Sequence, residues 1–214
     1  VFDSMLDSAG IDVSGSPSTI RIEKKPAFYE PVIISEVSSP VLSEIIEVLN
    51  HESVNLFAEH LLKELGRTFN NHGTTEAGIE VLYRFLKDSG VDSSGMFLVD
   101  GSGLSPLNAI TSKNLAEILR FMKNRAKYFN EFYSSLPGAG REGTLKNYFR
   151  NPVFDSNLRA KSGSITRVRS YAGYFRTLSG NEMVFSILVN NYSGSSKRII
   201  TGIEDILLET IMNK

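Results

Sequence analysis

Cysteine is missing from this sequence, and its absence excludes several kinds of chemistry. None of the 214 residues is cysteine, so the chain forms no disulfide, binds no metal through thiolates and has no cysteine nucleophile. Long apolar runs are missing too, since no stretch reaches the roughly 20 apolar residues that a membrane-spanning helix needs. The first four residues, Val1–Ser4, have neither the basic start nor the apolar segment of a signal peptide. Because Val1 stands where methionine usually begins a chain, we expect an internal or processed segment.

An excess of either charge is also missing. The 23 basic and 24 acidic side chains give a formal net charge of -1, and the basic residues form only isolated pairs at Lys24-Lys25 and Lys197-Arg198. We therefore expect neither a nucleic-acid partner nor a membrane-surface partner. The three histidines do not have metal-binding spacing, so we expect them to be structural or exposed and predict no metal site; they are His51, His60 and His72.

The apolar residues, with 41% of the chain hydrophobic, predict helices through much of the sequence. One helix is expected from Phe2 to Ala9, then short strands at Ile20–Ile22 and Val32–Val37. Ser39-Pro40 is typical of a helix start, so a helix is expected to follow it as far as Leu49. The polar run Asn50–Asn55 would be the entrance of a second helix ending at Gly66. Further helices are expected around residues 79–88, 115–122 and 128–136, with a short buried strand at 96–99.

After Asn157 the apolar pattern becomes that of a sheet. Val168–Thr177 and Glu182–Asn190 are predicted strands, joined by a hairpin turn at Leu178–Asn181. The second strand carries apolar residues on both faces, which indicates that both faces of the sheet are covered. Ile199–Ile211 has the spacing of an amphipathic helix that could supply part of this cover.

The stretch Arg159–Ile165, which precedes this hairpin, combines a lysine, two serines and a glycine. On a regular strand Lys161 and Gly163 point to one face and the hydroxyls of Ser162 and Ser164 to the other. Gly163 would let another backbone or a ligand approach closely, and a cation beside free amides could hold a carboxylate or an oxyanion. Taken alone, these residues are better explained by an ordinary strand with a surface lysine.

Two further stretches have competing interpretations. Ser53 and Asn55 could simply cap a helix, or a hydroxyl and a carboxamide two residues apart could relay a proton and hold an amide. Gly138–Gly143 matches the dinucleotide-binding pattern GxGxxG, but it follows a predicted helix and Pro137, where that fold requires a strand. We therefore do not predict a nucleotide site, and no cofactor is expected.

Taken together, Ser53-Val54-Asn55 and Lys161-Ser162-Gly163-Ser164 match two motifs of penicillin-recognising serine enzymes. With the stretches 100–105 (DGSGLS) and 136–145 (LPGAGREGTL), the chain from about Val37 onward resembles the D-alanyl-D-alanine carboxypeptidase/endopeptidases of the class C low-molecular-mass penicillin-binding proteins, peptidase family S13. The resemblance implies an α/β fold in the broad (α+β) sense: an antiparallel sheet flanked by helices on both faces, as in transpeptidases and β-lactamases. Residues 37–214 would be the C-terminal part of the catalytic domain. Residues 1–36 would be its junction with an insertion domain, or its start.

The sequence departs from the family pattern twice. Serine stands at position 162 where threonine is usual, which keeps the hydroxyl. More importantly, no serine is followed by lysine three residues later, so the family's Ser-x-x-Lys motif, which carries the nucleophile, is absent. The resemblance places that motif upstream, and we expect this chain alone to lack the nucleophile.

The resemblance also implies a role for each motif residue. Ser53 would pass a proton to the leaving amine, Asn55 would hold the substrate backbone, and Lys161 would supply positive potential. Ser162, Gly163 and Ser164 would bind the substrate, the two hydroxyls engaging its terminal carboxylate and the Ser164 amide the oxyanion. The implied ligands are peptidoglycan stem peptides and β-lactams, and the implied location is periplasmic or otherwise extracytoplasmic. A non-catalytic peptidoglycan-binding module, or a related β-lactamase or esterase, remains an alternative.

Overall fold

The computed structural model describes residues 2–16, 18, 33 and 35–213, and the chain divides into two compact units between Ser39 and Pro40. In the first unit, helix α1 (Phe2–Ser8) confirms the helix predicted at the start of the chain and buries none of its residues. The strand expected at Ile20–Ile22 lies outside the described residues. The strand expected at Val32–Val37 lies partly outside them, and its described end is wrong, because residues 35–41 form no regular structure and Val37 is 91% exposed.

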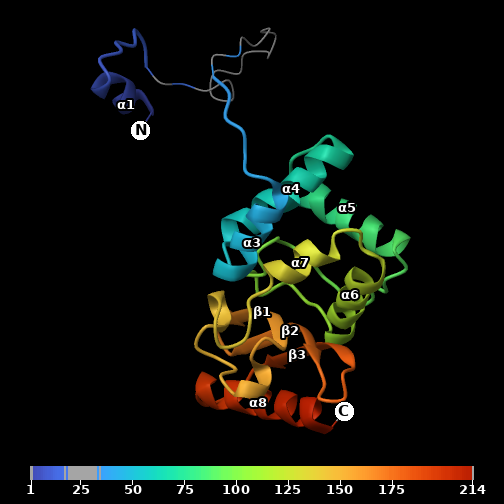
Figure 1. Cartoon of the computed structure of the whole chain (residues 1–214). Coiled ribbons are helices and arrows are strands. Elements are labelled where there is room, and N and C mark those ends of the chain that lie inside the picture. The colour runs from blue at the N-terminus through green and yellow to red at the C-terminus, as the bar shows by residue number, and fades with distance from the viewer. Residues whose placement is uncertain (1, 17, 19–32, 34, 214) are drawn as a thin grey trace. The chain divides into compact units, whose positions relative to one another are not determined.

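The second unit is a helical layer followed by a sheet (Figure 1). In chain order its elements are α3 (Leu42–Glu52), α4 (Asn55–Asn70), α5 (Thr75–Asp88), α6 (Ser112–Arg125), α7 (Phe129–Ser135), two single 3-10 turns, η1 (Gly143–Leu145) and η2 (Pro152–Phe154), strands β1 (Leu158–Ile165), β2 (Val168–Arg176) and β3 (Glu182–Asn190), and α8 (Ser196–Asn213).

Two boundaries differ from the sequence predictions. Val41, not Ser39, caps α3, and it does so without a side-chain hydrogen bond, so the helix starts two residues later than the Ser-Pro pair suggested. Met96–Val99 is not a strand: Phe97 forms only an isolated bridge with Ala109, and its side chain is 66% exposed. This bridge has two backbone hydrogen bonds between Phe97 and Ala109, but it does not extend the sheet.

The three strands form one antiparallel sheet in the order β1-β2-β3. Lys161 lies opposite Ala172, which in turn lies opposite Ser186. The predicted hairpin between β2 and β3 is confirmed: Thr177 donates its N–H to the Asn181 carbonyl at 2.9 Å, and Gly180 has the positive φ that such a turn requires. Because β2 lies in the middle, β1 keeps one edge free for contacts other than the sheet.

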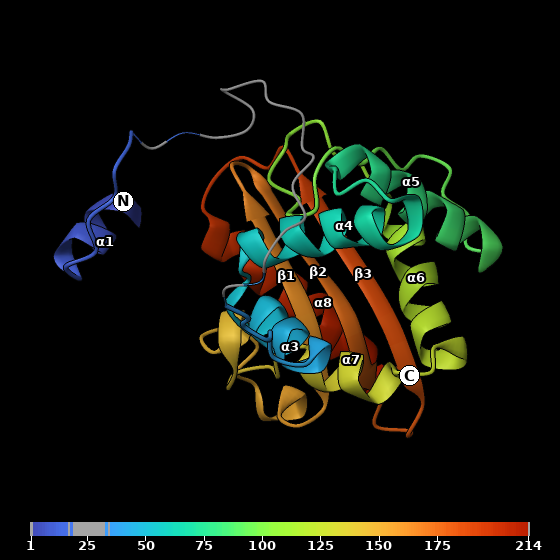
Figure 2. The ribbon, with the colours of Figure 1, turned by 90° about the horizontal axis from the view of Figure 1, so that it is seen from above.

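Helices cover both faces of this sheet, as the apolar pattern of β3 indicated. On one face α8 packs against a large cluster that includes Leu158, Ala160, Tyr171 and Phe175. On the other face Tyr174 packs with residues of α6 and α7, and its hydroxyl donates to the Leu119 carbonyl at 2.8 Å. Figure 2 shows α8 behind the strands and α3 and α7 in front of them. The predicted fold class is therefore confirmed.

Candidate active site

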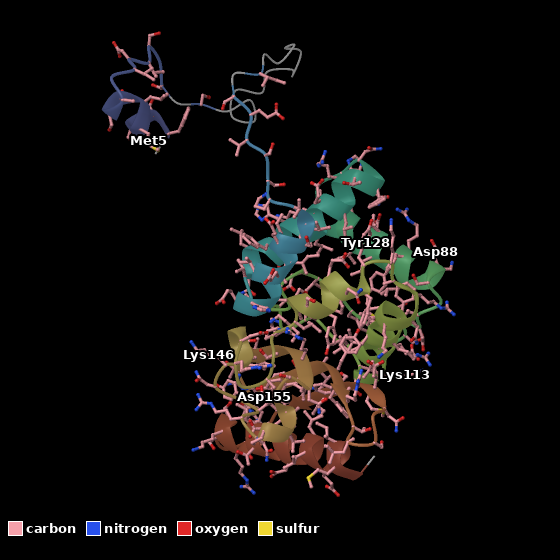
Figure 3. The ribbon with its side chains drawn as sticks, viewed as in Figure 1. Met5, Asp88, Lys113, Tyr128, Lys146 and Asp155 are labelled. Atoms are coloured by element: carbon pink, nitrogen blue, oxygen red, sulfur yellow. The ribbon has the colours of Figure 1, made fainter. Side chains whose placement is uncertain are left out.

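The end of α3 meets the middle of β1 through Ser53 and Lys161. The Lys161 ammonium donates to Ser53 Oγ at 2.9 Å and to the Ser162 carbonyl at 3.0 Å. Lys113 and Lys146, labelled in Figure 3, are exposed lysines, whereas Lys161 is half-buried. Burial lowers the pKa of Lys161 because it disfavours the charged form. The structure thus joins two predicted site residues that are 108 positions apart.

Ser53 reaches Lys161 because the chain turns sharply at this residue. Its φ of 55° is in the left-handed region and ends α3, while its N–H bonds the Leu49 carbonyl. Helix α4 begins only at Asn55, with Val54 as its N-cap and no side-chain cap. The expectation that the polar run forms one helix entrance is therefore wrong: Asn50–Glu52 is the last turn of α3, and the Ser53 hydroxyl is used by Lys161 rather than by a helix start.

Asn55 lies close in sequence to this contact but is not part of it. It is the first residue of α4, its side chain is exposed, and within the described part of the chain that side chain makes no hydrogen bond. The structure therefore brings Ser53 and Lys161 together and leaves the Asn55 carboxamide free for another group.

The outer edge of β1 is covered over its first half only. Residues 137–139 pair with it: Ala160 donates its N–H to the Pro137 carbonyl at 3.1 Å, and Ala139 donates to the Leu158 carbonyl at 3.0 Å. Successive residues of a strand direct their backbone groups to alternate sides, so Ser162 and Ser164 direct theirs outward as Leu158 and Ala160 do. Among the described residues only the Lys161 ammonium bonds an outward backbone group of this second half, the Ser162 carbonyl.

The side chains of this second half have different surroundings. Ser162 Oγ donates to Thr144 Oγ1 at 2.9 Å, and Ser164 is exposed. At Gly163 an added Cβ would overlap Ser170 Oγ. The group that lies close to Gly163 is thus the side chain of Ser170. The sequence had suggested that another backbone or a ligand would approach Gly163.

The glycine-rich loop that matches GxGxxG lies between α3 and β1 and contacts both through Glu142. Glu142 accepts the Gly138 N–H at 2.9 Å and an Arg159 guanidinium N–H at 3.0 Å. The Glu142 carboxylate also lies 4.0 Å from His51 Nε2, a buried atom without a hydrogen-bond partner in the described residues. Sequence reasoning gave Glu142 and Thr144 no role of their own, although both lie in the family-like stretch 136–145, because their partners Arg159 and Ser162 are 17 and 18 residues further along the chain.

Metal-binding groups and membrane-spanning helices are both absent from the described residues. No group of three or more His, Cys, Asp or Glu side chains is placed there to hold a metal ion. None of the helices described has the length and apolar character needed to cross a membrane.

Comparison with known proteins decides the family. The pattern of the D-Ala-D-Ala carboxypeptidase 3 (S13) family matches residues 1–209. This chain belongs to the S13 family. Among curated relatives, a D-alanyl-D-alanine carboxypeptidase of Actinomadura sp. (strain R39) is 32% identical over 200 residues, which cover 91% of this chain and 36% of the relative. The chain thus spans little more than a third of that relative's length.

Solved structures agree with the fold of an S13 domain. Penicillin-binding protein 4 from Haemophilus influenzae, in complex with a β-lactam, superimposes with a TM-score of 0.73 at 21% identity, covering 78% of this chain and 41% of that one. A class A β-lactamase from Bacteroides cellulosilyticus has a TM-score of 0.63 at 16% identity, over 99% of this chain and 79% of the other. The S13 chain therefore has the helix-and-sheet architecture that penicillin-binding proteins and class A β-lactamases share.

Proposed function

We propose that this chain is the substrate-binding, C-terminal part of a serine-type D-Ala-D-Ala carboxypeptidase/endopeptidase. The enzyme acts on peptidoglycan stem peptides through an acyl-enzyme and is inhibited by β-lactams. The observation that carries the proposal is the 2.9 Å contact between Lys161 Nζ and Ser53 Oγ, next to the uncovered half of β1. Membership of the S13 family supports the same reaction class.

Ser53 serves as the proton donor to the leaving amine. Lys161 donates to Ser53 Oγ, so the serine's own proton is free to point toward a ligand. Burial lowers the pKa of Lys161, which makes its ammonium a readier donor of the proton that replaces the one Ser53 passes to the amine. Asn55, exposed two residues away, holds the substrate backbone with its carboxamide.

The uncovered half of β1 binds the C-terminal end of the substrate. An extended peptide can add to a sheet edge through main-chain hydrogen bonds, and Gly163 lies between the two residues whose backbone groups face that edge. The Ser164 N–H stabilises the oxyanion, while the Ser162 and Ser164 hydroxyls and the Lys161 charge attract the terminal carboxylate.

The nucleophile lies outside these 214 residues, since the sequence contains no Ser-x-x-Lys. Residues 37–214 form the C-terminal part of the catalytic domain, and residues 1–36 are its junction with an insertion domain or its start. The natural substrate, peptidoglycan, places the protein in the periplasm or otherwise outside the cytoplasm.

Labelled penicillin added to the complete protein tests this function. We expect one serine outside residues 1–214 to be acylated, and D-alanine to be released from a D-Ala-D-Ala peptide. A label on a serine within residues 1–214 would contradict the position of the nucleophile. Folded protein that takes up no label would favour a non-catalytic peptidoglycan-binding module, and rapid hydrolysis of the acyl-enzyme would favour a β-lactamase.

A further inference from the structure

Thr144 is the side chain that contacts the Ser162 hydroxyl. Ser162 Oγ donates to Thr144 Oγ1 at 2.9 Å, and both residues are half-buried. Ser162 follows Lys161, whose ammonium contacts Ser53. Thr144 is therefore linked to the proposed proton donor through Ser162 and Lys161, although the sequence assigned it no role of its own.

The position of Thr144 is fixed by its neighbours rather than by Ser162. Before it, Gly143 has a φ of 45°, and a Cβ there would overlap the His51 carbonyl oxygen. After it, Leu145 is fully buried at 0% exposure and donates its N–H to the Glu142 carbonyl at 3.0 Å. The Thr144 backbone is thus held between a close contact with α3 and a buried anchor in the α8-side cluster.

The direction of the hydroxyl pair matters for binding an anion. A serine hydroxyl has one proton; when Ser162 gives it to Thr144, only lone pairs face a carboxylate, and these repel it. Both hydroxyls can rotate without moving a heavy atom. After rotation Thr144 donates to Ser162, Ser162 donates to the carboxylate, and each bond polarises the next.

We propose that Thr144 is a positioning residue for the recognition of a free terminal carboxylate. Its hydroxyl donates a hydrogen bond to Ser162 Oγ when Ser162 turns its own proton toward the ligand. This inference rests on the proposed function, because that proposal makes Ser162 a carboxylate-binding group. It predicts a specificity effect, since a ligand without a negative charge gains nothing from the reversed pair.

The test compares two substitutions in the complete protein, Thr144→Val, which removes the hydroxyl at nearly constant volume, and Thr144→Ser, which keeps it. The probes are a labelled penicillin with a free carboxylate and its methyl ester. We expect T144V to lose about tenfold in the second-order acylation rate with the acid, the scale of one hydrogen bond. The rate with the ester should stay within about twofold, and T144S should keep both rates.

A matched control is Thr210→Val, which removes a threonine hydroxyl that donates to the Ile206 carbonyl at 2.7 Å within α8. It should leave both rates unchanged. Equal losses for acid and ester in T144V, or no loss for either, would overturn the inference. If T144V does not fold, Thr144→Ala is judged by the same ratio of rates. A wild-type protein that takes up no penicillin would instead overturn the proposed function, so the two failures are distinguishable.

Discussion

The two halves of β1 meet the rest of the molecule in different ways. In the first half, Leu158 and Ala160 are 1% and 0% exposed and belong to the cluster under α8. In the second half, Lys161 and Ser162 are half-buried and make single hydrogen bonds to Ser53 and Thr144. Apolar burial is shared among many neighbours, whereas a hydrogen bond depends on two atoms. Substitutions near the first half should therefore change stability, and those in the second half should change chemistry.

The largest effect on stability is expected for Phe154→Ala. Phe154 is 1% exposed and packs edge-to-face on Phe149 with ring centroids 5.6 Å apart. Truncation should lower the free energy of unfolding by about 3–5 kcal/mol, measured by urea denaturation of the complete protein. The control Phe97→Ala, at a 66% exposed side chain, should change it by less than about 0.5 kcal/mol. A slower acylation of folded F154A would contradict the division between the two halves.

Next in size is the effect of Lys161→Met on acylation. The change removes the ammonium that contacts Ser53 Oγ and keeps an apolar stem of similar length, so the acylation rate should fall about 100-fold. The free energy of unfolding should change by less than about 1 kcal/mol, because the lost charge was already partly desolvated. Lys146→Met, at the exposed lysine labelled in Figure 3, is the control. Unchanged acylation of K161M would remove β1 from the site.

Substitutions of Gly173 and Gly163 compare how tightly the two halves of β1 are packed. A Cβ at Gly173 would overlap the Arg159 carbonyl oxygen in the first half of β1, whereas a Cβ at Gly163 would meet only Ser170 Oγ. Backbone cannot move aside but a serine hydroxyl can rotate, so Gly173→Ala should cost about 1–3 kcal/mol and Gly163→Ala less than about 1 kcal/mol. Thermal unfolding of both variants checks the order, and a larger loss for G163A would contradict it.

The smallest effect is expected for Glu142→Gln and depends on pH. Burial opposes ionisation of Glu142, but the Gly138 amide and the charges of Arg159 and His51 outweigh it, so its pKa lies below the ordinary 4.5. A carboxyl whose pKa is lower in the folded state stabilises the fold above the unfolded pKa, and this stabilisation is lost as pH falls through the folded pKa. E142Q should therefore lose less stability than wild type on acidification below pH 4.5. Glu47→Gln, at an exposed residue of α3, is the control, and equal acid sensitivity of E142Q and wild type would contradict the prediction.

Local patterns were enough to predict much of this fold. The apolar patterns of β2 and β3 and the helical spacing from Ile199 to Ile211 are local features of the sequence, and the structure confirms these elements. The start of α3 was mispredicted because Ser39-Pro40 offers a good helix start that the chain does not use. Met96–Val99 has strand composition but only one bridging partner, and the number of partners is decided by tertiary structure.

The site was partly predictable for a different reason. Ser53 and Lys161 could be paired because they belong to motifs whose order is characteristic of a family, not because anything local connects them. Thr144 lies in the family-like stretch 136–145, but nothing there names its partner, and its contact with Ser162 arises only when the glycine-rich loop packs between α3 and β1. The roles of Ser53, Asn55, Lys161, Ser162, Gly163 and Ser164 in catalysis and binding stay predictions.

The left-handed conformation of Ser53 lowers stability at a position whose hydroxyl the proposed activity requires. A non-glycine residue at a φ of 55° costs about 1 kcal/mol relative to glycine, so Ser53→Gly would relax the end of α3. The same change would delete the only hydroxyl that the Lys161 ammonium contacts among the described residues. A selection for thermal stability alone would favour glycine at position 53, whereas a selection for acylation would keep the strained serine.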